Sequence, residues 1–290
     1  MLKRLFGNYL VEKGKLTSDQ LNTMLPVKED FKAGVEIVAI VTKVMTSSAV
    51  LELLKNINKE SEHFGETAVN QGLISDYKLD EMIAYQSNGF MKFIHLLVDK
   101  EYLSYDTISH VLDEFQQKNG FSDVQLSALI HDDLEQCINI FVPLKSPRLK
   151  DLVMTLVQTL RRLIDRDVYL EKAYTAHSIQ LDKYACQMIV GDMRIKFYIS
   201  APDNGLLAIA NHFTGDTYDT VTEDALDSVG EFINCVSGLF ATNMSYDNVS
   251  VDMNSPEYSM EGPFISNETL YVIPLHANGY DFRAVFEVYQ

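Results

Sequence analysis

EDALDSVGEFINCVSG, at residues 223–238, is the stretch that says most about how this chain folds. Thr222 precedes it, and Glu223 and Asp224 open it, which is the order of a hydroxyl N-cap followed by acids in the first turn of a helix. At about 100° per residue, the apolar side chains gather on one face of this helix. They are Leu226, Val229, Ile233, Val236 and Phe240. The pattern predicts a long helix that runs to about Thr242 and buries one side in a core.

The opposite side of this predicted helix carries Glu231 and Asn234, beside Asp227 and Gly238. Glu231 and Asn234 stand three positions apart, so their side chains are neighbours on the helix surface. The small residues Gly238 and Ala241 leave room for another backbone to approach. Polar residues on an outer helix face are most often simply solvated, so the spacing alone does not define a site.

The flanking segments predict an α+β domain. Helical spacing of apolar residues covers 148–165, and a shorter helix is expected over 203–213. Runs rich in Ile, Val, Tyr and Phe predict strands over 178–189, 193–200, 269–275 and 281–289. Gly191-Asp192 and Asn278-Gly279 fit the turns of two hairpins. Helices combined with hairpins indicate two layers, with helices lying on a largely antiparallel sheet.

The first 120 residues repeat on a period of 29. The aligned columns, all predicted to be buried except the Thr/Ser column, are Val11/Ile40/Val69/Val98, Leu16/Met45/Ile74/Leu103, Thr17/Thr46/Ser75/Ser104, Leu21/Val50/Leu79/Ile108 and Leu25/Leu54/Ile83/Leu112. Each unit fits a helix, a turn and a second helix, with the Thr or Ser as the N-cap of the second helix. Gly14 and Gly72 fit the end of the preceding helix. The N-terminal part is therefore predicted to be all-α, four helical hairpins that pack together.

The segment between these two parts predicts a connector. Gln116–Gly120 ends the last repeat helix, residues 122–140 are expected to form one further helix, and Pro143 and Pro147 interrupt the chain after that helix. We therefore divide the chain into a repeat domain at 1–120, a helical connector at 121–144 and an α+β domain at 145–290.

Charge and composition exclude several classes of function. The net charge of −17 is unlike that of proteins that bind nucleic acid or anionic membranes, which need clustered Lys and Arg. No run of about 18 apolar residues is present, so a membrane-spanning helix is not expected. The three cysteines are far apart and form neither a metal spacing nor a disulfide framework, which favours reduced cysteines in a cytoplasmic protein. A Gly-x-Gly-x-x-Gly motif and a P-loop are absent, and the seven histidines do not approach the spacing of zinc ligands.

The helix at 223–238 resembles the signature helix of the CheX/CheC phosphatases of bacterial chemotaxis. That family's pattern is an acid, two residues and then Asn, with one Gly before the acid and another four residues after the Asn; here these are Glu231, Asn234, Gly230 and Gly238. The order of predicted elements over about 145–290 also resembles the family. The first helix lacks a second copy of the motif, so one site per chain is implied, as in CheX.

The resemblance implies that this chain dephosphorylates the aspartyl phosphate of a CheY-like response regulator. Asn234 would orient the attacking water, and Glu231 would pair with a Lys of the regulator. The regulator would supply the Mg²⁺, so no metal or cofactor is expected in this chain. Because CheX proteins pair through their sheets, a homodimer is also implied.

The strong repeat copies, at residues 1–28 and 63–86, resemble the MshEN module of type II secretion and pilus ATPases, some members of which bind cyclic di-GMP. Leu5 and His63 stand where that motif has Arg, and its closing Gln is Gln86 in one copy and Lys28 in the other. Three functions therefore stay open: a phosphatase, a catalytically silent adaptor that binds a receiver domain, and a nucleotide sensor acting through the repeats. Without a nucleotide, the repeats would be a structural or docking element.

Overall fold

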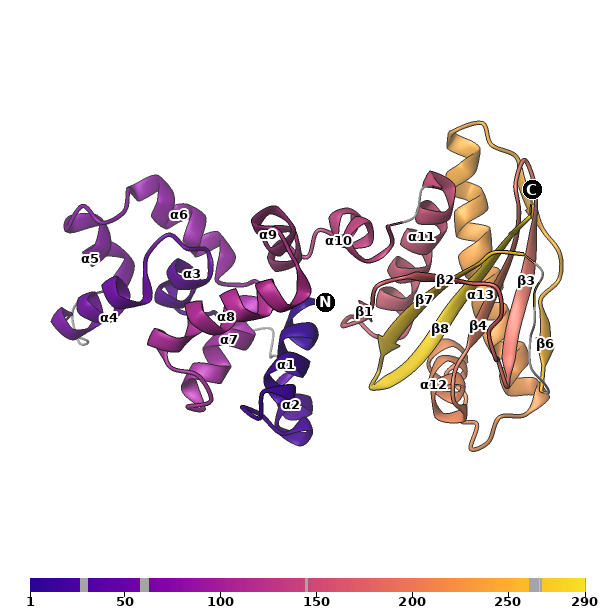
Figure 1. Ribbon diagram of the computed structural model, residues 1–290, viewed down its shortest axis with the longest axis horizontal. Coiled ribbons are helices and arrows are strands. Elements are labelled where there is room, and N and C mark those ends of the chain that lie inside the picture. Colours follow the sequence, from indigo (N-terminus) through magenta and orange to yellow (C-terminus); the bar gives the residue numbers. More distant parts are fainter. Residues whose placement is uncertain (27–30, 58–62, 144–145, 261–265, 267, 290) are drawn as a thin grey trace. The chain divides into compact units, whose positions relative to one another are not determined.

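The computed structural model describes residues 1–26, 31–57, 63–143, 146–260, 266 and 268–289. The chain divides into two compact units, Leu2–Asp133 and Leu134–Gln290, and each is described by itself (Figure 1). The first unit is helical, and the second combines helices with an antiparallel sheet. The predicted α+β class is therefore confirmed. Lys28 lies outside the described residues.

The first unit contains the four predicted helical hairpins and then a ninth helix. The hairpins are α1 (Leu2–Glu12) with α2 (Ser18–Met24), α3 (Val35–Val41) with α4 (Ser47–Asn56), α5 (Phe64–Asn70) with α6 (Asp76–Tyr85), and α7 (Gly89–Asp99) with α8 (Tyr105–Asn119). The ninth helix is α9 (Asp123–His131). The predicted Thr and Ser residues stand at the N-caps of α2, α4, α6 and α8.

The turns inside the hairpins follow the same 29-residue period as the sequence. The residues with left-handed backbone are Gly14 (φ 69°), Lys43 (φ 58°), Gly72 (φ 69°) and Glu101 (φ 60°). Only two of these four positions carry glycine, for which this conformation has no steric cost. The two weaker copies therefore adopt the same turn despite lacking its preferred residue.

The prediction that the aligned apolar positions are buried is right for only part of them. Val11, Val69, Val98, Leu54 and Leu79 are half-buried, and Ile83 is 43% exposed. Leu16, Met45, Ile74 and Leu103 are all buried. The column one residue before Leu25/Leu54/Ile83/Leu112 is the better buried one, at 4%, 2%, 1% and 2% exposed for Met24, Leu53, Met82 and Val111. In α4 and α6, the side that faces the core is therefore centred about one residue earlier in the chain than the aligned apolar residues predicted.

The single helix predicted over 122–140 is two helices. Asp132 takes a left-handed conformation (φ 55°) and ends α9, and α10 (Leu134–Phe141) begins in the second unit. Asn and Asp tolerate this conformation better than most residues because their short polar side chains bond locally. The break could not be read from apolar spacing, which continues through it.

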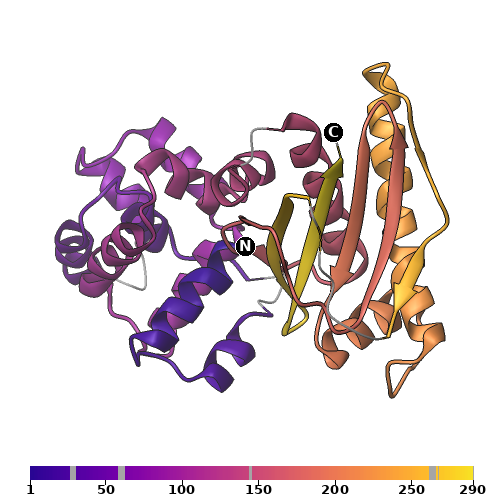
Figure 2. The same cartoon turned by 45° about the vertical axis from the view of Figure 1, so that its right-hand side comes forward.

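The second unit places three further helices beside an eight-stranded sheet (Figures 1 and 2). The helices are α11 (Pro147–Leu163), α12 (Asp203–Thr214) and α13 (Glu223–Tyr246), close to the predicted bounds. The strands are β1 (Tyr169–Leu170), β2 (Tyr174–Ala176), β3 (Tyr184–Gly191), β4 (Arg194–Ser200), β5 (Val251–Met253), β6 (Glu257–Ser259), β7 (Leu270–Ala277) and β8 (Tyr280–Tyr289). The order is β1-β7-β8-β4-β3-β5, with β2 also on β7 and β6 also on β3, and every pairing is antiparallel.

Four of these strands were not predicted. β1, β2, β5 and β6 are two or three residues long, too short for alternation to be read from the sequence. The strand predicted over 178–189 begins at Tyr184 instead, because Ile179 and Leu181 join a cluster that covers one face of the sheet. The opposite face of β3 lies against α13, the helix that carries the predicted site.

Candidate functional site

Glu231 and Asn234 lie on one side of α13, as their spacing predicted. Asn234 Nδ2 donates to Glu231 Oε2 at 3.3 Å. Glu231 is exposed, whereas Asn234 is half-buried. Asn234 is therefore less solvated than its place opposite the apolar face of the helix suggested.

The cause of this burial is Gln187 in strand β3. Gln187 Nε2 donates to Asn234 Oδ1 at 2.7 Å and to the main-chain oxygen of Asn254 at 2.8 Å. Gln187 has an exposed fraction of 0%. Its position alternates with those of Cys186 and Met188, so it projects to the side of the sheet that faces α13. Gln187 was not among the predicted site residues, although an amide inside a strand of mostly apolar residues is itself a signal.

Asn254 belongs to a bulge at the edge of the sheet. β3 pairs with β5 up to Ile189–Met253 and with β6 from Cys186–Glu257. Two residues of β3, 187 and 188, therefore face three residues of the neighbouring strand, 254–256. Bulges redirect backbone groups and are frequent beside active sites. Here the bulge turns the Asn254 carbonyl toward Gln187, while the Asn254 N–H donates to the Met188 carbonyl at 2.9 Å.

Gly230 allows this bulge to lie close to α13. A Cβ added at Gly230 would stand 3.0 Å from Pro256 Cβ, closer than nearly all real contacts of this kind. Gly230 is four residues before Asn234, so both face the bulge. Gly238, by contrast, has no described atom outside its own helix within 4 Å of an added Cβ. The close approach expected at Gly238 is thus not made by the described part of this chain.

The side chains around this site carry negative charge. Asp224, Asp227 and Glu231 are exposed along α13, and no Lys or Arg occurs between Lys196 and Arg283. Such a surface favours a cationic group on a docking partner. Within the described residues, no three His, Cys, Asp or Glu side chains are arranged to hold a metal ion.

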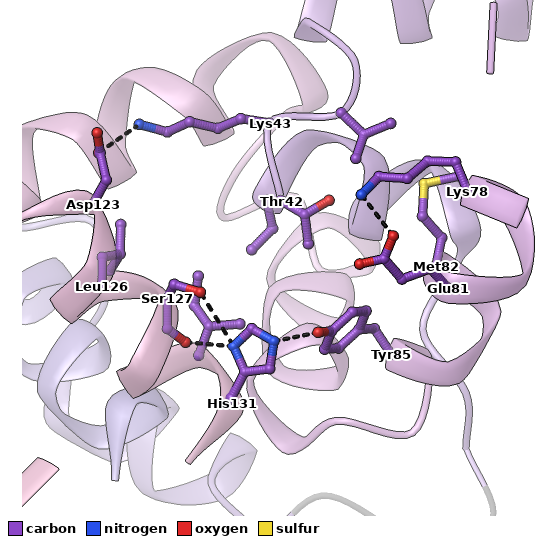
Figure 3. Close-up of a pocket in the computed structure, with 13 residues that line it drawn as sticks. Thr42, Lys43, Lys78, Glu81, Met82, Tyr85, Asp123, Leu126, Ser127 and His131 are labelled. Carbon is purple, nitrogen blue, oxygen red and sulfur yellow. Dashed lines mark hydrogen bonds and ion pairs between the residues drawn. The ribbon is translucent and has the colours of Figure 1, made fainter. Parts of the chain in front are cut away.

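The first unit contains a separate pocket of about 270 Å³, lined by the turn after α3 and by helices α6 and α9 (Figure 3). Lys43 Nζ lies 3.0 Å from Asp113, and Lys78 Nζ lies 2.7 Å from Glu81. His131 Nδ1 is 2.6 Å from the Ser127 carbonyl, and its other ring nitrogen bonds the Tyr85 hydroxyl. The cations of the pocket are thus matched by groups of the chain itself.

The positions of the predicted nucleotide motif lie elsewhere in the repeats. Neither Leu5 nor His63 is among the described residues that line this pocket. His63 is the exposed N-cap residue of α5, and Leu5 is half-buried in α1. Gln86 donates from Nε2 to the Ala33 carbonyl at 2.6 Å, so its amide joins two repeat units. Of these three motif residues, Gln86 is therefore engaged by a contact within the chain itself.

Comparison with known proteins bears on the second unit. The family described as chemotaxis phosphatase CheX matches residues 184–276, a stretch that begins at strand β3 and includes Gln187, Glu231 and Asn234. The match does not reach the first unit, so the likeness of the repeats to MshEN stays a prediction. None of the curated proteins matches the chain. Among the described residues, no helix is both long and apolar enough to cross a membrane.

Several solved structures are similar to about half of this chain. A chemotaxis protein CheX from Desulfovibrio desulfuricans is 18% identical, with a TM-score of 0.44, and the alignment covers 50% of this chain and 100% of that one. A CheC-like protein from a Shewanella species is 16% identical, with a TM-score of 0.45 and coverages of 51% and 100%. A CheX–CheY–BeF₃–Mg²⁺ complex from Borrelia burgdorferi is 13% identical, with a TM-score of 0.39 and coverages of 49% and 98%.

Proposed function

We propose that the second unit is a phosphatase that hydrolyses the aspartyl phosphate of a CheY-like response regulator. One observation carries the proposal: Asn234 presents a half-buried carboxamide on α13 that is held at both ends, within the stretch that matches the CheX family. Such a group is immobilised before the partner arrives. Preorganised polar groups of this kind lower barriers because they need no reorganisation during the reaction.

This chain takes little part in the covalent chemistry of the reaction. The oxygen of a water forms a bond to phosphorus, and the bond between phosphorus and the Asp carboxylate oxygen breaks. The electron pair leaves with the carboxylate, and both hydrogens of the water stay with the released inorganic phosphate, one on the oxygen that attacked and one on another phosphate oxygen. Phosphoryl transfer depends mainly on positioning and charge stabilisation. In this scheme the regulator brings the charge stabilisation, its Mg²⁺ and its Lys, and Asn234 positions the water.

Glu231 has the second role in the proposal. It is exposed, and its carboxylate already accepts a hydrogen bond from Asn234. An ammonium group of the regulator that approached Glu231 would therefore be set at a fixed distance from the amide. The other acids of α13 would strengthen this attraction at low salt.

We also infer that two copies pair through their sheets, which light scattering on the purified chain would test.

The test is the decay of a phosphorylated receiver domain with Mg²⁺, with and without this protein. The proposal requires that decay accelerates in proportion to the protein concentration and that the Asn234→Ala variant loses the effect. Receiver binding without faster decay would identify a catalytically silent adaptor. If the protein neither binds nor dephosphorylates the receivers of its own cell, the proposal is wrong.

A further inference from the structure

We propose that Gln187 is a positioning residue of this site: it holds the Asn234 carboxamide so that the oxygen points inward and the N–H₂ group points to the docking partner. The inference rests on the proposed function and adds a residue in a different element. Three hydrogen bonds connect Asn254, Gln187, Asn234 and Glu231 in series. Each bond fixes the orientation of the amide that makes the next one.

The main chain fixes the first step. The carbonyl oxygen of Asn254 can only accept a hydrogen bond, so the group of Gln187 that lies 2.8 Å away must be its donor, Nε2. The bulge holds this carbonyl in place, because the Asn254 N–H is bonded to Met188 and Pro256 packs on Gly230. The orientation of the Gln187 amide is thus set by backbone atoms.

The second step passes this orientation to Asn234. Because Nε2 of Gln187 faces Asn234 at 2.7 Å, Asn234 must offer its acceptor, Oδ1, in that direction. Its donor, Nδ2, is then directed away from the sheet, where one of its hydrogens meets Glu231 Oε2 at 3.3 Å. The second hydrogen of Nδ2 is left for a group brought by the partner.

A donor is chemically suited to hold the attacking water. An N–H that donates to the water oxygen occupies one lone pair and leaves the other free to attack phosphorus. A carbonyl oxygen in the same place would accept a hydrogen of the water, but it would also face the negatively charged oxygens of the acyl phosphate and be repelled by them. The buried chain of bonds therefore selects which end of the amide the acyl phosphate meets.

The placement of a glutamine at 187 supports a role beyond packing. The residue is fully buried, and among the described residues its Oε1 finds no hydrogen-bond partner. An unsatisfied buried oxygen is unfavourable for folding, and an apolar side chain of similar length would avoid it. Gln187 thus retains a polar group at a place where only its Nε2 is used, and that atom contacts Asn234.

The experiment replaces Gln187 by Met, which has a similar length and no donor, and compares it with Asn234→Asp. We expect Gln187→Met to lower kcat at least tenfold with KM within twofold of wild type. Asn234→Asp keeps an acceptor for Gln187 but has no outward donor, so it should lose activity as fully as Asn234→Ala. An unchanged kcat in Gln187→Met, or an active Asn234→Asp, would overturn the inference. A lower melting temperature together with a raised KM would show a merely structural role.

A second readout does not depend on activity. The side-chain NH₂ resonances of Asn234, assigned by their absence in Asn234→Ala, should move toward the values of a solvent-exposed amide in Gln187→Met and exchange faster with water. If these resonances do not change, Gln187 does not hold Asn234, and the inference is wrong. If the wild-type protein does not accelerate receiver decay, the proposed function fails, and this measurement alone decides the role of Gln187.

Discussion

Asn234 donates to Glu231 across one turn of α13, with 3.3 Å between Nδ2 and Oε2. The two residues that the resemblance to CheX/CheC proteins singled out are thus in direct contact. The contact joins the amide assigned to the water with the carboxylate assigned to the partner. Removing the Asn234 side chain and removing the Glu231 side chain should nevertheless affect different kinetic constants.

Asn234→Ala should reduce receiver dephosphorylation by about 10²-fold or more, the usual loss for one preorganised polar group. Its stability should fall by about 1 kcal/mol because the bond from Gln187 is lost. This exceeds the ±0.5 kcal/mol typical of a solvated surface position. Receiver decay rates and chemical denaturation measure the two effects. Thr242→Ala, a substitution at an exposed position of the same helix, is the control and should change neither the dephosphorylation rate nor the stability.

Glu231→Ala should raise KM about tenfold and change kcat less, because the carboxylate acts in docking. Glu231→Gln separates charge from hydrogen bonding, since its oxygen can still accept from Asn234. If docking depends on charge, both variants raise KM alike. A Glu231→Gln variant with wild-type KM would show that Glu231 serves only to orient Asn234.

Cys235 should be the first cysteine to react with iodoacetamide at pH 8. It is half-exposed next to Asn234, whereas Cys137 and Cys186 are buried. Burial also raises the pKa of Cys186 to about 11, which leaves little of the reactive thiolate. Alkylation at Cys235 should block receiver docking in step with the modification measured by mass spectrometry. A Cys235→Ser variant should keep its activity under the same treatment; loss of activity in that variant would place the sensitive thiol elsewhere.

The repeats should not bind cyclic di-GMP with a submicromolar dissociation constant. Leu5 and His63 lack the planar, charged group with which Arg matches phosphate and stacks on bases. The lysines of the pocket in the same unit already have acidic partners, Lys43 with Asp113 and Lys78 with Glu81. Isothermal titration calorimetry measures the dissociation constant directly. Tight binding would contradict the prediction and favour the nucleotide-sensor function of the repeats.

Gly7→Ala should destabilise the repeats more than Gly65→Ala. A Cβ at Gly7 would lie 2.2 Å from Leu21 Cδ1, and one at Gly65 would lie 2.4 Å from Leu79 Cδ1. Leu21 is 3% exposed and has nowhere to move, whereas Leu79 is half-exposed. Overpacking costs about 1–3 kcal/mol, against a gain of about 1 kcal/mol from replacing a helical Gly. We expect net destabilisation only for Gly7→Ala in chemical denaturation; equal effects would contradict this account.

Local features of the sequence were enough for the helices, the longer strands and the contact between Glu231 and Asn234. Thr17, Thr46 and Ser75 could be recognised as N-caps because a cap bonds a backbone N–H three residues away. The 29-residue period was equally visible, because each hairpin repeats the same local pattern. These interactions join residues that are close in the sequence, so they can be predicted without knowledge of the tertiary structure.

Only the tertiary structure decided how the amide of Asn234 is held. Gln187 and Asn234 are 47 residues apart in different elements, and the bond between them depends on how α13 lies on β3. It also depends on the bulge at 254–256, which exists only because β5 and β6 both pair with β3. The orientation of a side-chain amide is set by whichever donors and acceptors surround it in space. The spacing of residues in the sequence thus placed Asn234 on the helix, and strand pairing far from it along the chain determined which of its atoms faces outward.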